Sequence, residues 1–218
     1  MTRAVFFDAA GTLFRLTRSV GWHYRDVALR HGADLREDDL NRAFRRAWRN
    51  AAAPHETEGP RPDEDRGWWR ALVGRVLDEC GGAPEMNRDA YFSELWSEFT
   101  RPGVWELFPE TIEVLAALQG SMRLGVISNF DSRLRTILAH LGVAEFFDDI
   151  VISSEVGADK PSAKIFSAAL ARADIAASEA LHIGDEPEAD WIGAERAGLR
   201  VFRLQRPENS LRGVLDLL

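Results

Sequence analysis

The chain has 218 residues, of which 45% are hydrophobic and 28% are charged. This composition is typical of a globular protein with one sizeable core, or with one domain that carries a smaller insert. The net charge of −8 argues against binding to nucleic acid or to an anionic membrane, because both require a basic surface. The single cysteine, Cys80, excludes an internal disulfide, and no apolar stretch approaches the ~18 residues of a membrane span. The N-terminus also lacks the layout of a signal peptide, so we expect a cytoplasmic protein.

The first predicted element is a short apolar run, residues 4–7, which ends in Asp8. Small residues, a glycine and Thr12 follow at once, a pattern that predicts a buried strand delivering a carboxylate to a tight loop. Asp8 is therefore the first candidate for chemistry. The alternative at this point is an aspartate that stabilises a turn after an edge strand.

The segment after this strand is predicted to be entirely helical. Apolar residues recur at three- and four-residue spacing over four stretches, 19–31, 38–53, 64–80 and 87–99. A polar loop with proline and glycine, residues 54–62, separates the second stretch from the third. No strand pattern intervenes, so residues 16–104 are predicted to form an all-helical inserted domain.

From residue 110 onward, predicted helices and strands alternate. The helices are 110–118, 132–141, 162–173 and 191–197, and the strands are 123–127, 149–153, 180–183 and 200–204. Alternation of this kind predicts an α/β domain, a Rossmann-like, doubly wound parallel sheet covered on both faces, formed by residues 1–15 and 105–218. Such sheets bind ligands outside the carboxyl ends of their strands.

Polar residues follow the predicted strands at four places. Each of them alone has an ordinary explanation as a helix cap or a surface charge. Together, a carboxylate, a hydroxyl, a lysine and an acidic cluster at one sheet edge predict a functional site. In chain order these residues are Asp8, Ser128 with Asn129, Lys160, and Asp185 with Glu186 and Asp190.

The four motifs resemble those of the haloacid dehalogenase-like (HAD) hydrolase superfamily, over essentially the whole chain. The matching residues are Asp8-Ala-Ala-Gly-Thr12, Ser128, Lys160, and Gly184-Asp185 through Asp190. The helical insert occupies the position of the helical cap of that family, and details such as residues 126–131 resemble one subgroup in particular. The resemblance implies a hydrolase, and specifically a phosphatase of a small phosphorylated molecule. We expect the protein to be a monomer or a homodimer.

The resemblance also implies a Mg²⁺ site. Asp8 would be the nucleophile that forms an aspartyl-phosphate, and the Ala10 carbonyl and the Asp185 carboxylate would hold the metal with it, supported by Asp190. Carboxylates gathered in this way repel one another unless a divalent cation is present, and Mg²⁺ prefers oxygen ligands. Glu186 is either a further ligand or a solvent-facing residue.

The resemblance assigns a second group of residues to the phosphate. Ser128 would donate to a phosphoryl oxygen, and Lys160 would join Asp8 to the phosphate as a point charge. Thr12 and Asn129 are further candidate donors.

The sequence departs from the pattern of the family at Ala10, where phosphatases of this superfamily normally carry a second aspartate. That aspartate protonates the leaving group, and general acid-base help of this kind contributes about 10²–10⁴-fold to a rate. The first hypothesis is a slow phosphohydrolase, in which His23 is either a substitute acid or a packing residue. The second is a phosphate- and metal-binding or interaction protein without efficient catalysis.

Two other activities are disfavoured. Haloacid dehalogenases lack the Gly184-Asp185 motif, although Arg15 could clamp a carboxylate substrate. Cleavage of phosphonoacetaldehyde in this superfamily needs a lysine in the cap, and both lysines of this chain, Lys160 and Lys164, lie outside the predicted insert.

Overall fold

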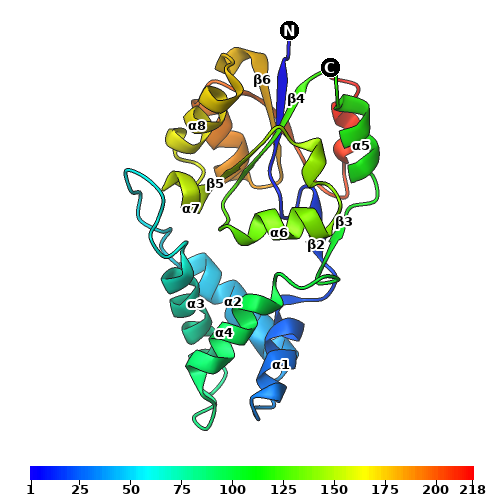
Figure 1. Ribbon diagram of the computed structural model, residues 1–218. Helices are drawn as coiled ribbons and strands as arrows, with labels where there is room; N and C mark the ends of the chain where they lie inside the picture. The colour runs from blue at the N-terminus through cyan, green and yellow to red at the C-terminus, as the bar shows by residue number, and fades with distance from the viewer. The chain divides into compact units, whose positions relative to one another are not determined.

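The computed structural model describes residues 1–218, and the chain divides into two compact units (Figure 1). The core unit contains Met1–Arg15, His55–Glu64 and Glu106–Leu218, and the helical unit contains Leu16–Pro54 and Asp65–Trp105. Residues 55–64, cyan in Figure 1, thus belong to the core unit although the chain on both sides of them belongs to the helical unit. We call residues 55–64 the strap.

The core unit is built on a five-stranded parallel sheet. Its strand order is β5-β4-β1-β6-β7, with β1 (Ala4–Phe7), β4 (Arg123–Ser128), β5 (Asp149–Ile152), β6 (Ala180–Gly184) and β7 (Arg200–Arg203). The central strand β1 is buried along its whole length, which explains its uninterrupted apolar sequence. The sheet confirms the predicted α/β fold.

Helices cover both faces of this sheet, and Figure 1 shows α8 and α5 on opposite sides of it. The helices of the core unit are α5 (Thr111–Leu118), α6 (Arg133–His140), α7 (Ser153–Val156), α8 (Ala163–Ala173) and α9 (Gly193–Arg196). Short 3₁₀ turns lie at Ala144–Phe146, Ala177–Glu179 and Leu211–Val214. Apolar residues of α8, Ile165 and Phe166, pack against Phe6, Ile127 and Val151 of the sheet, so this side of the core is a continuous apolar layer.

The helical unit consists of α1 (Val20–Arg30), α2 (Glu37–Asn50), α3 (Arg66–Glu79) and α4 (Arg88–Glu98). All four predicted helices are present, and their ends differ from the predicted ones by one to three residues. Their apolar faces meet in a buried cluster that includes Tyr24, Leu40, Leu72 and Tyr91. No helix of the protein combines the length and the apolar character that a membrane crossing requires.

Besides the 3₁₀ turns, three short elements were not predicted. Strands β2 (Phe14–Leu16) and β3 (Trp105–Leu107) form a separate two-stranded sheet, and α7 is a single helical turn directly after β5. Elements of three or four residues are too short to show a hydrophobic period, so the sequence carries no signal for them.

Candidate active site

The parallel strands of the core bring the predicted site residues to one edge of the sheet. Phe7 of β1 pairs in register with Val126 of β4 and Ile183 of β6. Asp8 follows β1 directly, and its amide donates to the Ile183 carbonyl over 2.8 Å. Ser128 is the last residue of β4, so both side chains are presented at the carboxyl edge, where such sheets bind ligands.

Lys160 lies at the centre of this site. Its Nζ donates to Asp8 Oδ1 over 2.7 Å, to Asp190 Oδ1 over 2.6 Å and to the Ile127 carbonyl over 2.9 Å. These three acceptors use all three N–H groups of an ammonium. Burial alone would lower the pKa of Lys160, but Asp8 and Asp190 raise it above its ordinary value, so the side chain stays charged.

The Asp8 carboxylate is held through one of its two oxygens. Oδ1 accepts from Lys160 and, over 3.3 Å, from Ser128 Oγ, whereas Oδ2 makes no hydrogen bond. Burial raises the pKa of Asp8 to about 7, with Lys160 lowering it and Asp190 raising it further. The carboxylate is therefore oriented by Oδ1 and leaves Oδ2 available for chemistry.

Asp190 is positioned by a π-helical turn, Pro187–Ile192, that follows β6. This turn and α9 replace the predicted helix 191–197, and they return Asp190 to the end of the strand. Its Oδ2 accepts from the Glu186 amide over 3.0 Å. A Cβ atom on Gly184 would lie 2.3 Å from that oxygen, so only glycine leaves room for this close approach.

His182 of β6 also contacts Asp190, although the sequence did not predict a role for it. Its Nε2 lies 2.9 Å from Asp190 Oδ1, the oxygen that also accepts from Lys160. His182 is completely buried, and its Nδ1 has no partner. Burial would raise the pKa of Asp190, but Lys160 and His182 hold it well below its usual range. The only sequence feature that could have indicated a role for His182 is its place as a polar residue within an otherwise apolar strand.

The acidic residues form a group that fits a divalent cation. Asp8, Asp185 and Asp190 each offer one carboxylate oxygen, and these oxygens lie within 4.8 Å of one another. Burial, together with the charge of Asp190, raises the pKa of Asp185. A Cβ atom on Gly11 would lie 2.5 Å from Asp185 Oδ2, so this glycine keeps the space beside the carboxylate open. An all-oxygen, mutually repelling set of this kind suits Mg²⁺.

Of the remaining predicted residues of the core unit, two form hydrogen bonds to site residues and three are exposed. Thr12 Oγ1 donates to Asp185 Oδ1 over 3.2 Å. The Asn129 side chain accepts from the Lys160 amide over 2.6 Å and donates to the Lys160 carbonyl over 2.9 Å, so it fixes the backbone of Lys160. Three further residues, Ala10, Glu186 and Arg15, are exposed, and Arg15 pairs with Glu106 over 2.8 Å.

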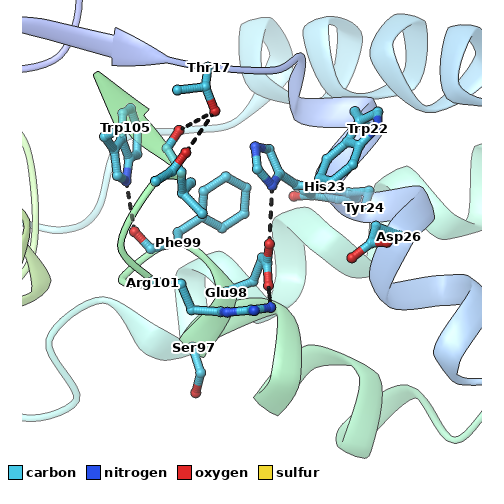
Figure 2. A network of polar contacts seen from close by, with 12 residues as sticks. Thr17, Trp22, His23, Tyr24, Asp26, Ser97, Glu98, Phe99, Arg101 and Trp105 are labelled. Atoms are coloured by element: carbon cyan, nitrogen blue, oxygen red, sulfur yellow. Dashed lines mark hydrogen bonds and ion pairs between the residues drawn. The ribbon is translucent and has the colours of Figure 1, made fainter. Parts of the chain in front are cut away.

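His23 belongs to the helical unit, where it is only 2% exposed (Figure 2). Its Nδ1 lies 3.3 Å from Glu98 Oε1, and its buried Nε2 has no partner. The rings of Trp22 and Phe99 pack against the imidazole. Burial lowers the pKa of His23, while the contact with Glu98 opposes that shift, so the ring is neutral at pH 7.

Comparison with known proteins gives a consistent result for most of the chain. A family model described as haloacid dehalogenase-like hydrolase matches residues 2–198. Haloacid dehalogenase-like hydrolase domain-containing protein 3 is 31% identical in Mus musculus, over 92% of this chain and 80% of the relative. The Danio rerio protein of the same name is 32% identical, over 94% and 86%. This subgroup is the one expected from the sequence details, and that prediction is confirmed.

Other similar proteins include enzymes and solved structures. Phosphoserine phosphatase of Thermus thermophilus is 37% identical, over 62% of this chain and 54% of its own length. The structure of the putative HAD-hydrolase YfnB from Bacillus subtilis, bound to magnesium, covers 100% of this chain and 98% of its own, with a TM-score of 0.72 and 22% identity. The defluorinating L-2-haloacid dehalogenase Rha0230 covers 94% and 82%, with a TM-score of 0.77 and 20% identity. At these identities the two structures show a shared fold.

Proposed function

Because the chain belongs to the haloacid dehalogenase-like hydrolase family, we propose that it hydrolyses a small phosphorylated metabolite with Asp8 as nucleophile and Mg²⁺ as cofactor. The observation that carries this proposal is the arrangement of Asp8, whose Oδ1 is fixed by Lys160 and Ser128 while Oδ2 makes no hydrogen bond. A binding site for phosphate alone would have no use for a carboxylate that is aimed at the ligand, because like charges repel.

In the proposed reaction, Asp8 Oδ2 attacks phosphorus, the new O–P bond forms, and the ester P–O bond breaks with its electron pair on the leaving oxygen. Ser128 lies beside the attacking carboxylate and would donate to a phosphoryl oxygen. The N–H groups of Lys160 are already used, so its ammonium would stabilise the negative charge that develops on the phosphoryl oxygens as a nearby point charge. A water molecule then attacks the aspartyl-phosphate, which releases inorganic phosphate and restores Asp8.

The metal proposal rests on the acidic group. When bound, Mg²⁺ would neutralise the charge that the carboxylates and the phosphoryl group bring together. The carboxylates of Asp8 and Asp185 and the backbone carbonyl of Ala10 would hold it. Both oxygens of Asp190 already accept hydrogen bonds, so its part is to orient Lys160 and the loop at Glu186.

Ala10 limits the proposed reaction. Its side chain has no proton for the leaving oxygen, so we expect turnover to be slow and to favour esters with good leaving groups. His23 does not solve this problem at neutral pH, because burial keeps its imidazole unprotonated.

Ala10 also favours a second candidate, in which the protein binds phosphate and metal without efficient turnover. We propose in both cases that the ligand is a small phosphorylated molecule rather than nucleic acid or a membrane, since the protein carries a net charge of −8. The protein would act as a monomer or a homodimer.

The test compares the wild type with Asp8→Asn. Mg²⁺ with beryllofluoride, a mimic of the phosphoryl group on aspartate, should raise the melting temperature of the wild type only. A panel of phosphorylated metabolites and para-nitrophenyl phosphate, each with Mg²⁺ or with EDTA, should show metal-dependent turnover that Asp8→Asn abolishes. A thermal shift without turnover would support the binding protein, and equal turnover in both proteins would remove Asp8 from its role. Halide release from 2-chloropropionate in EDTA would instead indicate a dehalogenase.

A further inference from the structure

The strap, residues 55–64, packs along the loop that carries Lys160. The Thr57 amide donates to the Gly157 carbonyl over 2.8 Å, and the Arg61 amide donates to the Ser154 carbonyl over 2.8 Å. The strap therefore has defined backbone hydrogen bonds to the rest of the core unit, unlike a loop that lies freely in solvent.

One ion pair anchors the strap beside Lys160. The Arg61 guanidinium lies 2.6 Å from Asp159 Oδ2, and the two side chains are only 5% and 13% exposed. Arg61 is the one arginine of this arginine-rich chain that is buried, whereas the other arginines are half-buried or exposed. Asp159 directly precedes Lys160, so the pair fixes the backbone next to the lysine.

The strap approaches this loop unusually closely. A Cβ atom on Gly157 would lie 2.1 Å from the Gly59 carbonyl oxygen and 2.3 Å from Thr57 Oγ1, so any larger residue would displace the strap. After Lys160, Ser162 Oγ donates to Glu56 Oε2 over 3.0 Å, and Lys164 Nζ donates to the Thr57 carbonyl. The strap thus contacts the chain on both sides of Lys160.

We propose that Arg61 is a positioning residue for Lys160. Its pairing with Asp159 docks the strap and holds the loop 157–160 so that Lys160 Nζ reaches Asp8 and Asp190 together. A three-acceptor arrangement tolerates little displacement, and misplacement by about 1 Å can cost a reaction up to about 100-fold. The docking of the strap by Arg61 is independent of the proposed function, whereas the expected effect of Arg61 on turnover rests on that function.

The chain offers a direct probe, because its only lysines are Lys160 and Lys164. Selective ¹⁵N labelling of lysine gives two Nζ signals, and the buried, fully hydrogen-bonded ammonium of Lys160 should exchange slowly with solvent. Arg61→Ala should shift and broaden this signal and should speed hydrogen exchange at the Thr57 amide by about tenfold or more. An unchanged Lys160 signal in Arg61→Ala would overturn the proposal.

Matched variants separate positioning from general destabilisation. Arg61→Lys keeps a cation beside Asp159 and should restore most of the amide protection, while Glu58→Ala, at an exposed strap position, should behave as the wild type. Gly157→Ala changes neither Arg61 nor Asp159, but its added Cβ atom should displace the strap and speed hydrogen exchange at the Thr57 amide. Strap protection that persists in Gly157→Ala would contradict the docking.

Turnover of para-nitrophenyl phosphate gives the functional readout. We expect Arg61→Ala to lower kcat about tenfold with little change in KM, because Lys160 acts on the charge of the transition state. If Asp8→Asn is inactive but Arg61→Ala keeps the wild-type kcat, the positioning role of Arg61 is refuted and the proposed function stands. A wild type without turnover would refute the proposed function, and the Lys160 Nζ signal would still decide whether Arg61 positions Lys160.

Discussion

Lys160 Nζ donates to Asp8 Oδ1 over 2.7 Å, which joins residues that lie 152 positions apart in the chain. The same ammonium contacts Asp190, so one cation compensates two buried carboxylates. Lys160→Met removes the charge and keeps an unbranched side chain of similar length. We expect the unfolding free energy to fall by about 3–5 kcal/mol, because the carboxylates lose their partner, and turnover to fall at least about 100-fold. Urea denaturation and steady-state kinetics measure the two effects.

A double variant separates the charge effect from lost packing. Asp8→Asn combined with Lys160→Met leaves one unpaired carboxylate fewer than Lys160→Met alone. The double variant should therefore be more stable than the sum of the two single effects predicts. Strict additivity would show that the two side chains are not energetically coupled.

Ala10→Asp should raise turnover at least about tenfold for alkyl phosphates, because it supplies the missing proton donor two residues after Asp8. Ala10 is exposed, so the larger side chain can be accommodated. Ala10→Asn, of the same size but without an acidic proton, is the matched control. An equal gain in both variants would show that proton donation is not the cause.

The sequence was sufficient to predict the sheet and the residues at its carboxyl edge, because each of them follows a recognisable strand. Asp8 follows an apolar run, and the acidic cluster at Asp185 follows another. The contacts of Lys160 with Asn129 and of Asp159 with Arg61 could not be predicted, since they depend on how a loop returns to the sheet. Residues 54–62 were predicted as a polar loop within the helical insert, and nothing in that pattern indicates that Arg61 is buried.

His182 is expected to hold Asp190 in place. His182→Leu removes the donor to Asp190 Oδ1, whereas His182→Gln keeps a donor on a side chain of similar size. Because hydrogen bonds to charged groups contribute about 1.5–3 kcal/mol, the leucine variant should lose about that much unfolding free energy and the glutamine variant less. Thermal denaturation of both proteins measures the difference, and equal losses would show that packing, rather than the hydrogen bond, is responsible.

Mg²⁺ is expected to bind through Asp185. Calorimetric titration with MgCl₂ should show binding to the wild type and at least about tenfold weaker binding to Asp185→Asn, because the acidic group loses one of its three charges. Glu188→Gln removes a charge at an exposed position of the neighbouring turn and is the control for general electrostatics. Equal weakening in the two variants would place the metal outside the acidic group.

The last prediction concerns the pH dependence of stability and the buried pair of His23 and Glu98 (Figure 2). The negative charge of Asp26 also favours the protonated form of His23, and Arg101 and Arg30 form ion pairs with Glu98. Burial lowers the pKa of His23 from its ordinary value of 6.5 in the folded protein. Below that pH the unfolded chain binds a proton that the folded protein does not, so stability is retained above about pH 6.5 and is lost as the pH falls. We expect the wild type to lose more unfolding free energy than His23→Gln between pH 7.5 and about pH 5.5, measured by urea denaturation in the same buffers. The pKa of Glu98 is lowered from 4.5, so its own titration lies below this window, and parallel curves for the two proteins would show that His23 titrates alike in both states.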